Sequence, residues 1–203
     1  MASSLDRLVS KIQACRVCVE TPQGVALGHE PRPVLRVSTT ARLAVVGQAP
    51  GTRVHASGVP FSDPSGERLR DWMGVTAEEF YDVNRITIVP MGFCYPGQDA
   101  KGADLPPRRE CAPLWRPRLF AQLPQIELML LIGGYAQRWH LDDRRGVTAL
   151  VEDWRAVLDR PGSLRFLPLP HPSWRNNAWL KRHPWFEAEL LPRLRQEVRR
   201  LLG

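Results

Sequence analysis

Four short apolar runs constrain the fold more than any other feature of this sequence. Each run is continuous rather than alternating with polar residues, and together they cover residues 42–47, 85–91, 126–134 and 164–170. Strands that are buried on both faces have this pattern, which is typical of parallel sheets covered by helices. Segments with helical character lie between and after them, at residues 65–72, 113–122, 135–140, 147–158 and 184–202. The sequence therefore predicts an α/β fold, a three-layer α/β/α sandwich around a central four-stranded, mainly parallel sheet.

Length and charge indicate how many domains the chain has and which class of partner it binds. We expect a single domain over residues 1–203, beginning with an amphipathic helix that carries the first cysteine pair. The formal net charge of +7 is arginine-led, which favours a polyanionic partner, although a genome that prefers arginine to lysine gives the same composition. No stretch is apolar for the length of a bilayer crossing, and the amino terminus does not resemble a signal peptide. We therefore expect a cytoplasmic monomer with no membrane partner.

Four cysteines form one close pair and two distant residues. Cys15 and Cys18 make a C-x-x-C, whereas Cys94 and Cys111 flank a loop rich in Gly, Pro and charge. A disulfide framework is not expected in a reducing compartment. Four thiolates can instead complete a tetrahedral site, and sulfur ligands select zinc or an iron–sulfur cluster. The alternative is that some of these cysteines are simply small buried apolar residues.

Unusual loops follow three of the four apolar runs. The first run ends in GQAPG (residues 47–51), the second in GFCYPG (residues 92–97) and the fourth in HPSWRNN (residues 171–177). The carboxyl ends of parallel strands meet at one edge of the sheet, where such folds bind their ligands. We therefore expect the three loops to form one site.

The loop after the first run offers the most candidate ligand-binding residues. Its GQAPG turn can approach a ligand closely, because glycine has no side chain to hold the ligand away. The chain then continues through His55, Phe61 and Asp63. Ser65 and Gly66, at the start of a predicted helix, can present backbone N–H groups to a phosphate. Ser65 can equally be a helix cap.

The order of these motifs resembles the uracil-DNA glycosylase superfamily, most closely its iron–sulfur branch, family 4. That branch has G-E-x-P-G followed by E-D-x-x-G-x-P-F-V-G-x-A-G-x-x-L. The segments GQAPG and HASGVPFSDPSGERL match this skeleton, with His55 where the family has an aspartate. HPSWRNN resembles the second catalytic motif, and its asparagine resembles the form found in the single-strand-selective branch. The resemblance covers nearly the whole chain and implies a uracil-DNA glycosylase-like fold.

The resemblance also implies roles for individual residues, in an enzyme that hydrolyses the N-glycosidic bond of a deaminated base in single- or double-stranded DNA. The residues expected to bind a [4Fe–4S] cluster, or zinc as the alternative, are Cys15, Cys18, Cys94 and Cys111. The expected catalytic residues are His171, Gln48 and His55. The residues expected to bind the base are Gly47, Ala49, Pro50, Gly51, Phe61, Asp63 and Asn176. The residues expected to contact DNA are Ser65, Gly66, Ser173, Trp174 and Arg175.

Chemistry gives three of these residues specific tasks. Cleavage leaves negative charge on the base, which a donor such as His171 stabilises in the transition state. The base must first turn out of the DNA, so an aromatic that stacks on it and a wedge side chain that fills the gap are expected. Phe61 matches the family's stacking phenylalanine, and Trp174, or Arg175 beside it, is the candidate wedge. The plainer roles are core packing for Phe61, a surface turn for Trp174 and a solvent-exposed loop position for His55.

The sequence departs from the family pattern at two places that bear on catalysis and base recognition. Gln48 replaces the motif carboxylate, and Ala49 stands where other branches have an aspartate or asparagine. Glutamine orients water but cannot take a proton from it. Pro90 occupies the position of the asparagine that reads the uracil edge in family 4, and proline has no side-chain hydrogen bond to offer.

The sequence is therefore compatible with three functions. The first is a monofunctional glycosylase. The second is a DNA-binding or damage-sensing protein that keeps the pocket and the cluster but does not hydrolyse. The third is an iron–sulfur or zinc protein that binds a free nucleotide or another small anion. Salt-dependent DNA affinity separates the first two from the third.

Overall fold

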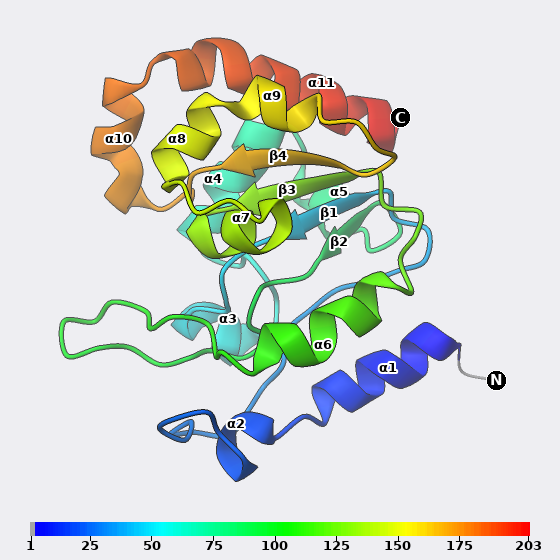
Figure 1. The fold of residues 1–203 in the computed structure, drawn as a ribbon, viewed down its shortest axis with the longest axis vertical. Coiled ribbons are helices and arrows are strands. Elements are labelled where there is room, and N and C mark those ends of the chain that lie inside the picture. Colours follow the sequence, from blue (N-terminus) through cyan, green and yellow to red (C-terminus); the bar gives the residue numbers. More distant parts are fainter. Residues whose placement is uncertain (1–2) are drawn as a thin grey trace.

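A parallel sheet runs through the centre of the computed structural model, which describes residues 3–203 (Figure 1). Its strands are β1 (Leu43–Val46), β2 (Ile86–Ile88), β3 (Leu128–Ile132) and β4 (Arg165–Leu169). They follow the order β2-β1-β3-β4, and each neighbouring pair is parallel. An isolated antiparallel bridge joins Ile88 to Arg36. The predicted α/β fold is confirmed, and these four strands are wholly rather than mainly parallel.

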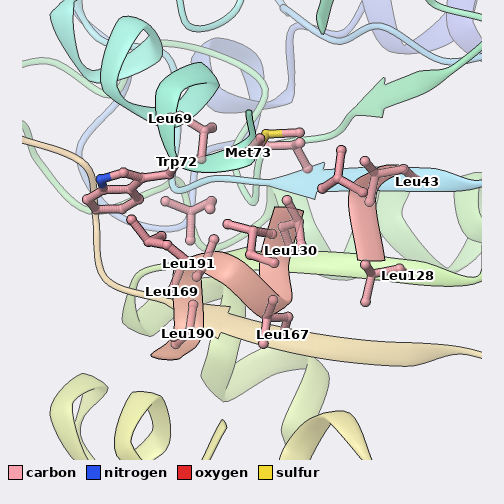
Figure 2. Packing of buried hydrophobic residues seen from close by; sticks show 14 of the residues in the cluster. Leu43, Leu69, Trp72, Met73, Leu128, Leu130, Leu167, Leu169, Leu190 and Leu191 are labelled. Carbon is pink, nitrogen blue, oxygen red and sulfur yellow. The ribbon is translucent and has the colours of Figure 1, made fainter. Parts of the chain in front are cut away.

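Neighbouring residues of β1, β3 and β4 pack into two separate cores, one on each face of the sheet. In β1, Leu43 and Val45 join one core cluster, whereas Ala44 and Val46 join the other. Figure 2 shows the first cluster, in which Trp72 and Met73 pack over the strands. Because both faces are apolar, the strands read as continuous apolar runs in the sequence.

Helices cover both faces. Those with two or more buried residues in the first core are α4 (Pro64–Met73), α9 (Trp154–Leu158), the π-helical turn η2 (Phe186–Leu190) and α11 (Leu191–Leu202). Those packed on the second core are α1 (Ser4–Gln13), α6 (Cys111–Phe120) and α7 (Gly134–Leu141). The remaining elements are α2 (Val17–Glu20), α3 (Thr52–Ser57), α5 (Ala77–Tyr81), α8 (Val147–Glu152), the 3-10 turn η1 (Trp174–Asn176) and α10 (Asn177–Arg182). No helix within residues 3–203 has the length and apolar character needed to cross a membrane.

Three sequence-based boundaries are wrong. The predicted helix at residues 147–158 is two helices that meet at Asp153. The predicted last helix begins with the π-helical turn, since Pro192 has no N–H to donate to the carbonyl four residues earlier. The first cysteine pair lies beyond α1, because that helix ends at Gln13 and Cys18 belongs to α2.

The arginines of α11 are not a merely solvated face. Arg199 donates to Glu79 at 2.6 Å, and Arg193 pairs with the buried Glu197 at 2.8 Å. Arg165 at the start of β4 also binds Glu197, and its hydrogen bonds lower the pKa of that carboxyl to about 2. Part of the positive charge therefore joins α11 to the rest of the fold.

A buried arginine–histidine contact links α6 and α7. Arg116 donates to the carbonyls of Val89 at 3.2 Å and Pro90 at 2.9 Å, and its Nη2 lies 2.6 Å from Nε2 of His140. Burial, together with the Arg116 charge, lowers the pKa of His140 to about 3. His140 is therefore a neutral hydrogen-bond acceptor in the folded protein, and Arg116 holds the chain just after β2.

We expect His140 to make the protein sensitive to acid. In the unfolded chain a histidine takes up a proton near pH 6.5. In the folded chain His140 takes up a proton only near pH 3. Its contribution to stability is therefore complete above about pH 6.5 and falls as the pH drops, by up to about 1.4 kcal/mol per pH unit. His140→Gln, which keeps an acceptor that does not titrate, should lose less stability between pH 7 and pH 4.5 in urea unfolding. An equal loss in both proteins would contradict this account.

Candidate active site

One cavity opens at the carboxyl edge of the sheet, where the predicted loops meet. Most of its lining comes from five segments: the turn after β1, residues 60–65 before and at the start of α4, Pro90 after β2, the loop at residues 96–105, and the segment after β4. The predicted catalytic and base-binding residues that line this cavity are Gly47, Gln48, Ala49, Pro50, Gly51, Phe61, Asp63, His171 and Asn176. The structure therefore brings the three motif loops into one site.

Phe61 is held against the turn after β1 by an unusual backbone. Its ring lies so close to Gly47 that a Cβ at that glycine would be 3.1 Å from the ring. The backbone φ of Phe61 is 55°, a strained value for a non-glycine residue. Tyr81 donates its hydroxyl to the Phe61 carbonyl at 3.0 Å and stabilises this conformation. The aromatic face is thus fixed before any ligand arrives.

Gly66 belongs to the support of Phe61 rather than to the cavity wall. A Cβ at Gly66 would lie 1.8 Å from the carbonyl oxygen of Phe61, so only glycine fits there. Asp63 caps α4, because its Oδ1 accepts a hydrogen bond from the Gly66 amide at 3.0 Å. Ser65 is therefore not the helix cap, and it lines the cavity.

His171 follows β4 in a loop that its own neighbours close. The Asn176 side chain donates to the His171 carbonyl at 2.6 Å, and Arg68 donates to the Ser173 carbonyl at 3.2 Å. The Asn176 amide therefore shapes the loop in addition to lining the cavity. Burial lowers the pKa of His171, and the negative charges of Asp63 and Asp104 partly oppose this shift. The imidazole is thus neutral near pH 7 and can donate one N–H into the cavity.

Trp174 and Arg175 stand at the mouth of the cavity. Trp174 is 71% exposed, and the Arg175 guanidinium carbon lies 5.8 Å from the centre of its ring. The hydroxyl of Ser173 accepts a hydrogen bond from the Arg175 amide and begins the turn that presents both side chains. An exposed indole above a cavity is well placed to contact a base or to enter a DNA stack.

His55 does not join this group. Its ring packs against His29 with centroids 4.7 Å apart and against Tyr95 at 5.7 Å, whereas its neighbours Arg53 and Val54 line the cavity. Burial lowers the pKa of His55, and the charges of His29 and Arg32 add to this effect. The structure therefore supports neither the predicted catalytic role nor a fully solvent-exposed position for His55.

Pro90 forms part of the cavity wall, where the expected side-chain amide is missing. The Pro90 carbonyl accepts a hydrogen bond from the buried Arg116. The two residues after Pro90 bind the turn after β1, because the Met91 and Gly92 amides donate to the carbonyls of Gly47 and Gln48. The wall beside Pro90 is therefore rigid but offers no side chain that reads a base edge.

Two contributions to the site were not predicted from the sequence. A second recess adjoins the first and shares Gln48, His171 and Asn176 with it, and its other side is built by the chain that follows β3. The Gly133–Gly134 pair at the end of the third apolar run was the available signal. Asp104, from the loop at residues 96–105, also lines the main cavity. That loop lies within a charged, proline-rich segment, so nothing in the sequence singled out one carboxylate.

The family model of the Uracil DNA glycosylase superfamily matches residues 36–195. The chain belongs to this superfamily. The matched region contains all the residues that line the main cavity except Val34. Membership supports a DNA glycosylase-type role in DNA repair, because the family acts on DNA. The match begins after Cys15 and Cys18, so it includes only the second cysteine pair of this superfamily member.

The four cysteines line one apolar cavity on the α6 side of the sheet. Its walls include Ile12, Phe93 and Trp115, and the four cysteines form no disulfide. The Phe93 amide donates to Sγ of Cys111 at 3.3 Å. Burial raises the pKa of Cys94 and of Cys111 to about 12, and the nearby cysteine sulfurs add to the shift of Cys94. The sulfurs would become thiolates only if a bound cation or cluster offset the unfavourable free energy of placing negative charge in this buried setting.

The residues fit a sulfur-ligated group in number and setting. Four thiols from three separate segments converge, and an amide donor to sulfur is typical of the surroundings of iron–sulfur clusters. A zinc ion requires four ligands at about 2.3 Å from one point. Within residues 3–203, no three His, Cys, Asp or Glu side chains are placed to hold a single metal ion.

Proposed function

We propose that this protein is a monofunctional DNA glycosylase that releases a deaminated base, uracil or a related lesion, after the base has turned out of DNA. The observation that carries the proposal is the position of His171. A half-buried, neutral imidazole follows β4 and lines the same cavity as the Gly47–Gly51 turn and the fixed Phe61 ring. An aromatic face and a hydrogen-bond donor around one cavity suit a planar base whose negative charge grows during the reaction.

Each residue then has a defined task. Phe61 stacks on the base, the backbone of the turn contacts its edge, and His171 donates to a base carbonyl as the glycosidic bond breaks. Gln48 lines both recesses and orients water without accepting its proton. Ser65 and Ser173 line the cavity mouth and are proposed to contact the DNA backbone.

We also propose that Cys15, Cys18, Cys94 and Cys111 hold a [4Fe–4S] cluster, as in family 4. When bound, the cluster would supply structural cross-linking, because the cysteines that would hold it lie before and in α2, in the loop after β2 and at the start of α6. Cys111 is the first residue of α6, the helix that also carries Arg116. The sulfur site therefore supports the Pro90 wall of the cavity through α6 rather than taking part in bond cleavage.

The decisive experiment is base release by anaerobically purified protein from oligonucleotides that contain uracil, hypoxanthine, xanthine or a mismatch, in single- and double-stranded form. We expect alkali-labile abasic sites with at least one lesion. If salt-dependent DNA binding occurs without base release from any lesion, the protein is the non-catalytic sensor instead. A small-anion binding protein would show neither.

We expect Trp174 to matter more in duplex DNA than in single strands. A wedge stabilises the gap that a flipped base leaves, and this gap exists only where neighbours were stacked and paired. Trp174→Ala should therefore lower base release from a duplex by roughly tenfold, since stacking contributes about 1–3 kcal/mol per base. The same change should affect a single strand less. Trp139→Ala, which removes another exposed indole on α7, is the matched control; equal losses on both substrates would exclude the wedge.

A further inference from the structure

The loop at residues 96–105 is a hairpin-like excursion over the cavity. Leu105 donates its amide to the Gly97 carbonyl at 2.9 Å, and Gln98 and Asp104 form an antiparallel bridge. At the tip, the Asp99 carboxylate accepts from the Lys101 amide at 2.8 Å and the Ala103 amide at 2.9 Å. We refer to residues 97–105 as the hairpin. Its internal hydrogen bonds give it a defined shape, so it can position a side chain.

Asp104 is the carboxylate that the hairpin brings to the cavity. Its Oδ1 accepts from the Gln98 side chain at 3.2 Å. Its Oδ2 faces the turn after β1, because a Cβ at Gly51 would lie 3.5 Å from that oxygen. The Gln48 side chain also reaches the Leu105 carbonyl, at 3.5 Å. The carboxylate therefore lies beside Gly51, at the end of the turn that has lost its own acidic residue, and it lines the same cavity as Gln48 and Ala49.

We propose that Asp104 replaces the missing motif carboxylate as the general base of hydrolysis, an inference that rests on the proposed glycosylase function. A water molecule attacks C1′ of the sugar and forms a C–O bond. The C1′–N bond breaks and its electron pair goes to the base, whose charge His171 stabilises. The water gives one proton to Asp104, which later releases it to solvent, and the departing base anion takes up one proton. The products are the free base and an abasic sugar bearing a hydroxyl at C1′.

Asp63 is the other acidic residue near His171, and its setting differs. Its Oδ1 caps α4 through the Gly66 amide, so the side chain is committed to the helix that supports Phe61. Among the described residues, Oδ2 has no hydrogen-bond partner in either carboxylate, but Asp104 is exposed to solvent whereas Asp63 is half-buried, so water reaches Asp104 more readily. The negative charge of Asp104 also favours positive charge that develops on the sugar as the base departs.

The test compares Asp104→Asn and Asp104→Ala with the wild type in single-turnover base release and in DNA binding at one salt concentration. We expect both variants to lose about a hundredfold in rate, the lower end of the range for general-base catalysis. DNA affinity should stay the same or increase, since a negative charge near the phosphates is removed. Added formate should restore part of the rate of Asp104→Ala, whereas chloride at the same ionic strength should not.

Three control variants make the result specific. Glu67→Gln removes the same charge from the exposed face of α4, and Gln98→Ala removes the hydrogen bond to Asp104 without removing the carboxylate. Glu67→Gln should retain most of the rate, whereas Gln98→Ala should lose part of it, because the lost hydrogen bond helps to direct Asp104 to the cavity. The third, Asp63→Asn, shows whether Asp63 rather than Asp104 is the general base. If the wild type is active and Asp104→Ala is equally active, the role of Asp104 is overturned while the proposed glycosylase function stands. A wild type that releases no base from any lesion would overturn the proposed function and this inference with it.

Discussion

Replacing His171 with alanine should lower the rate of base release by roughly a hundredfold to a thousandfold while DNA affinity changes little. The imidazole lines the cavity that the motif loops share, and its donor acts on charge that exists only as the glycosidic bond breaks. Ground-state binding depends instead on the DNA backbone and on Phe61. Single-turnover cleavage and equilibrium DNA binding, measured on the same oligonucleotide, separate the two effects.

Two comparison variants show whether that loss belongs to the donor. His55→Ala removes another imidazole, one that packs against His29 and Tyr95 outside the cavity, and it should retain nearly the full rate. Gln48→Ala should lose less than His171→Ala, because solvent can partly replace a group that only orients water. Similar small losses in all three variants would indicate a pocket that binds without catalysing.

The pH dependence follows from the lowered pKa of His171. Because burial keeps the imidazole neutral, its titration lies below the usual value of about 6.5. Raising the pH from 7 to 8.5 should therefore not remove the donor, and the rate should not fall in that window. A rate that drops as the pH rises through 7 would mean that the imidazolium form is the active one.

The sequence predicts the sheet and its edge because these depend on local patterns. Continuous apolar runs with glycine, proline or histidine at their ends place β1, β2 and β4 and the loops that follow them. The resemblance to the superfamily adds the order of the motifs. These sources account for the meeting of His171, Gln48 and Phe61 in one cavity.

Other features depend on contacts between distant residues, which no local pattern encodes. Asp104 reaches the cavity because hydrogen bonds within the hairpin direct it there. His55 occupies a motif position, yet its ring turns to His29, which lies in a loop with no recognisable motif. The fixed conformation of Phe61 arises from Tyr81 and Gly66, neither of which signals that role in the sequence.

Of the substitutions considered, Cys94→Ser should lower the stability of the protein most. The variant should be purified without iron or acid-labile sulfide, whereas the anaerobically purified wild type should contain both in equal amounts. Sites of this kind can contribute strongly to folding, about 10–16 kcal/mol for structural zinc in small peptides. We therefore expect a loss of several kcal/mol in the free energy of unfolding, measured in urea.

A packing control is needed because Cys94 is itself buried. Leu27 shares a small apolar cluster with Cys18 and Cys94, so Leu27→Ala opens a cavity beside the sulfurs without removing one. That variant should lose about 2–5 kcal/mol of stability and still contain iron. If the wild-type protein is colourless and contains stoichiometric zinc, the site holds a structural zinc ion instead of a cluster. If Cys94→Ser retains iron, Cys94 is not one of the ligands. Since α6 begins at Cys111 and holds the Pro90 carbonyl through Arg116, loss of the sulfur site should also lower the rate of base release.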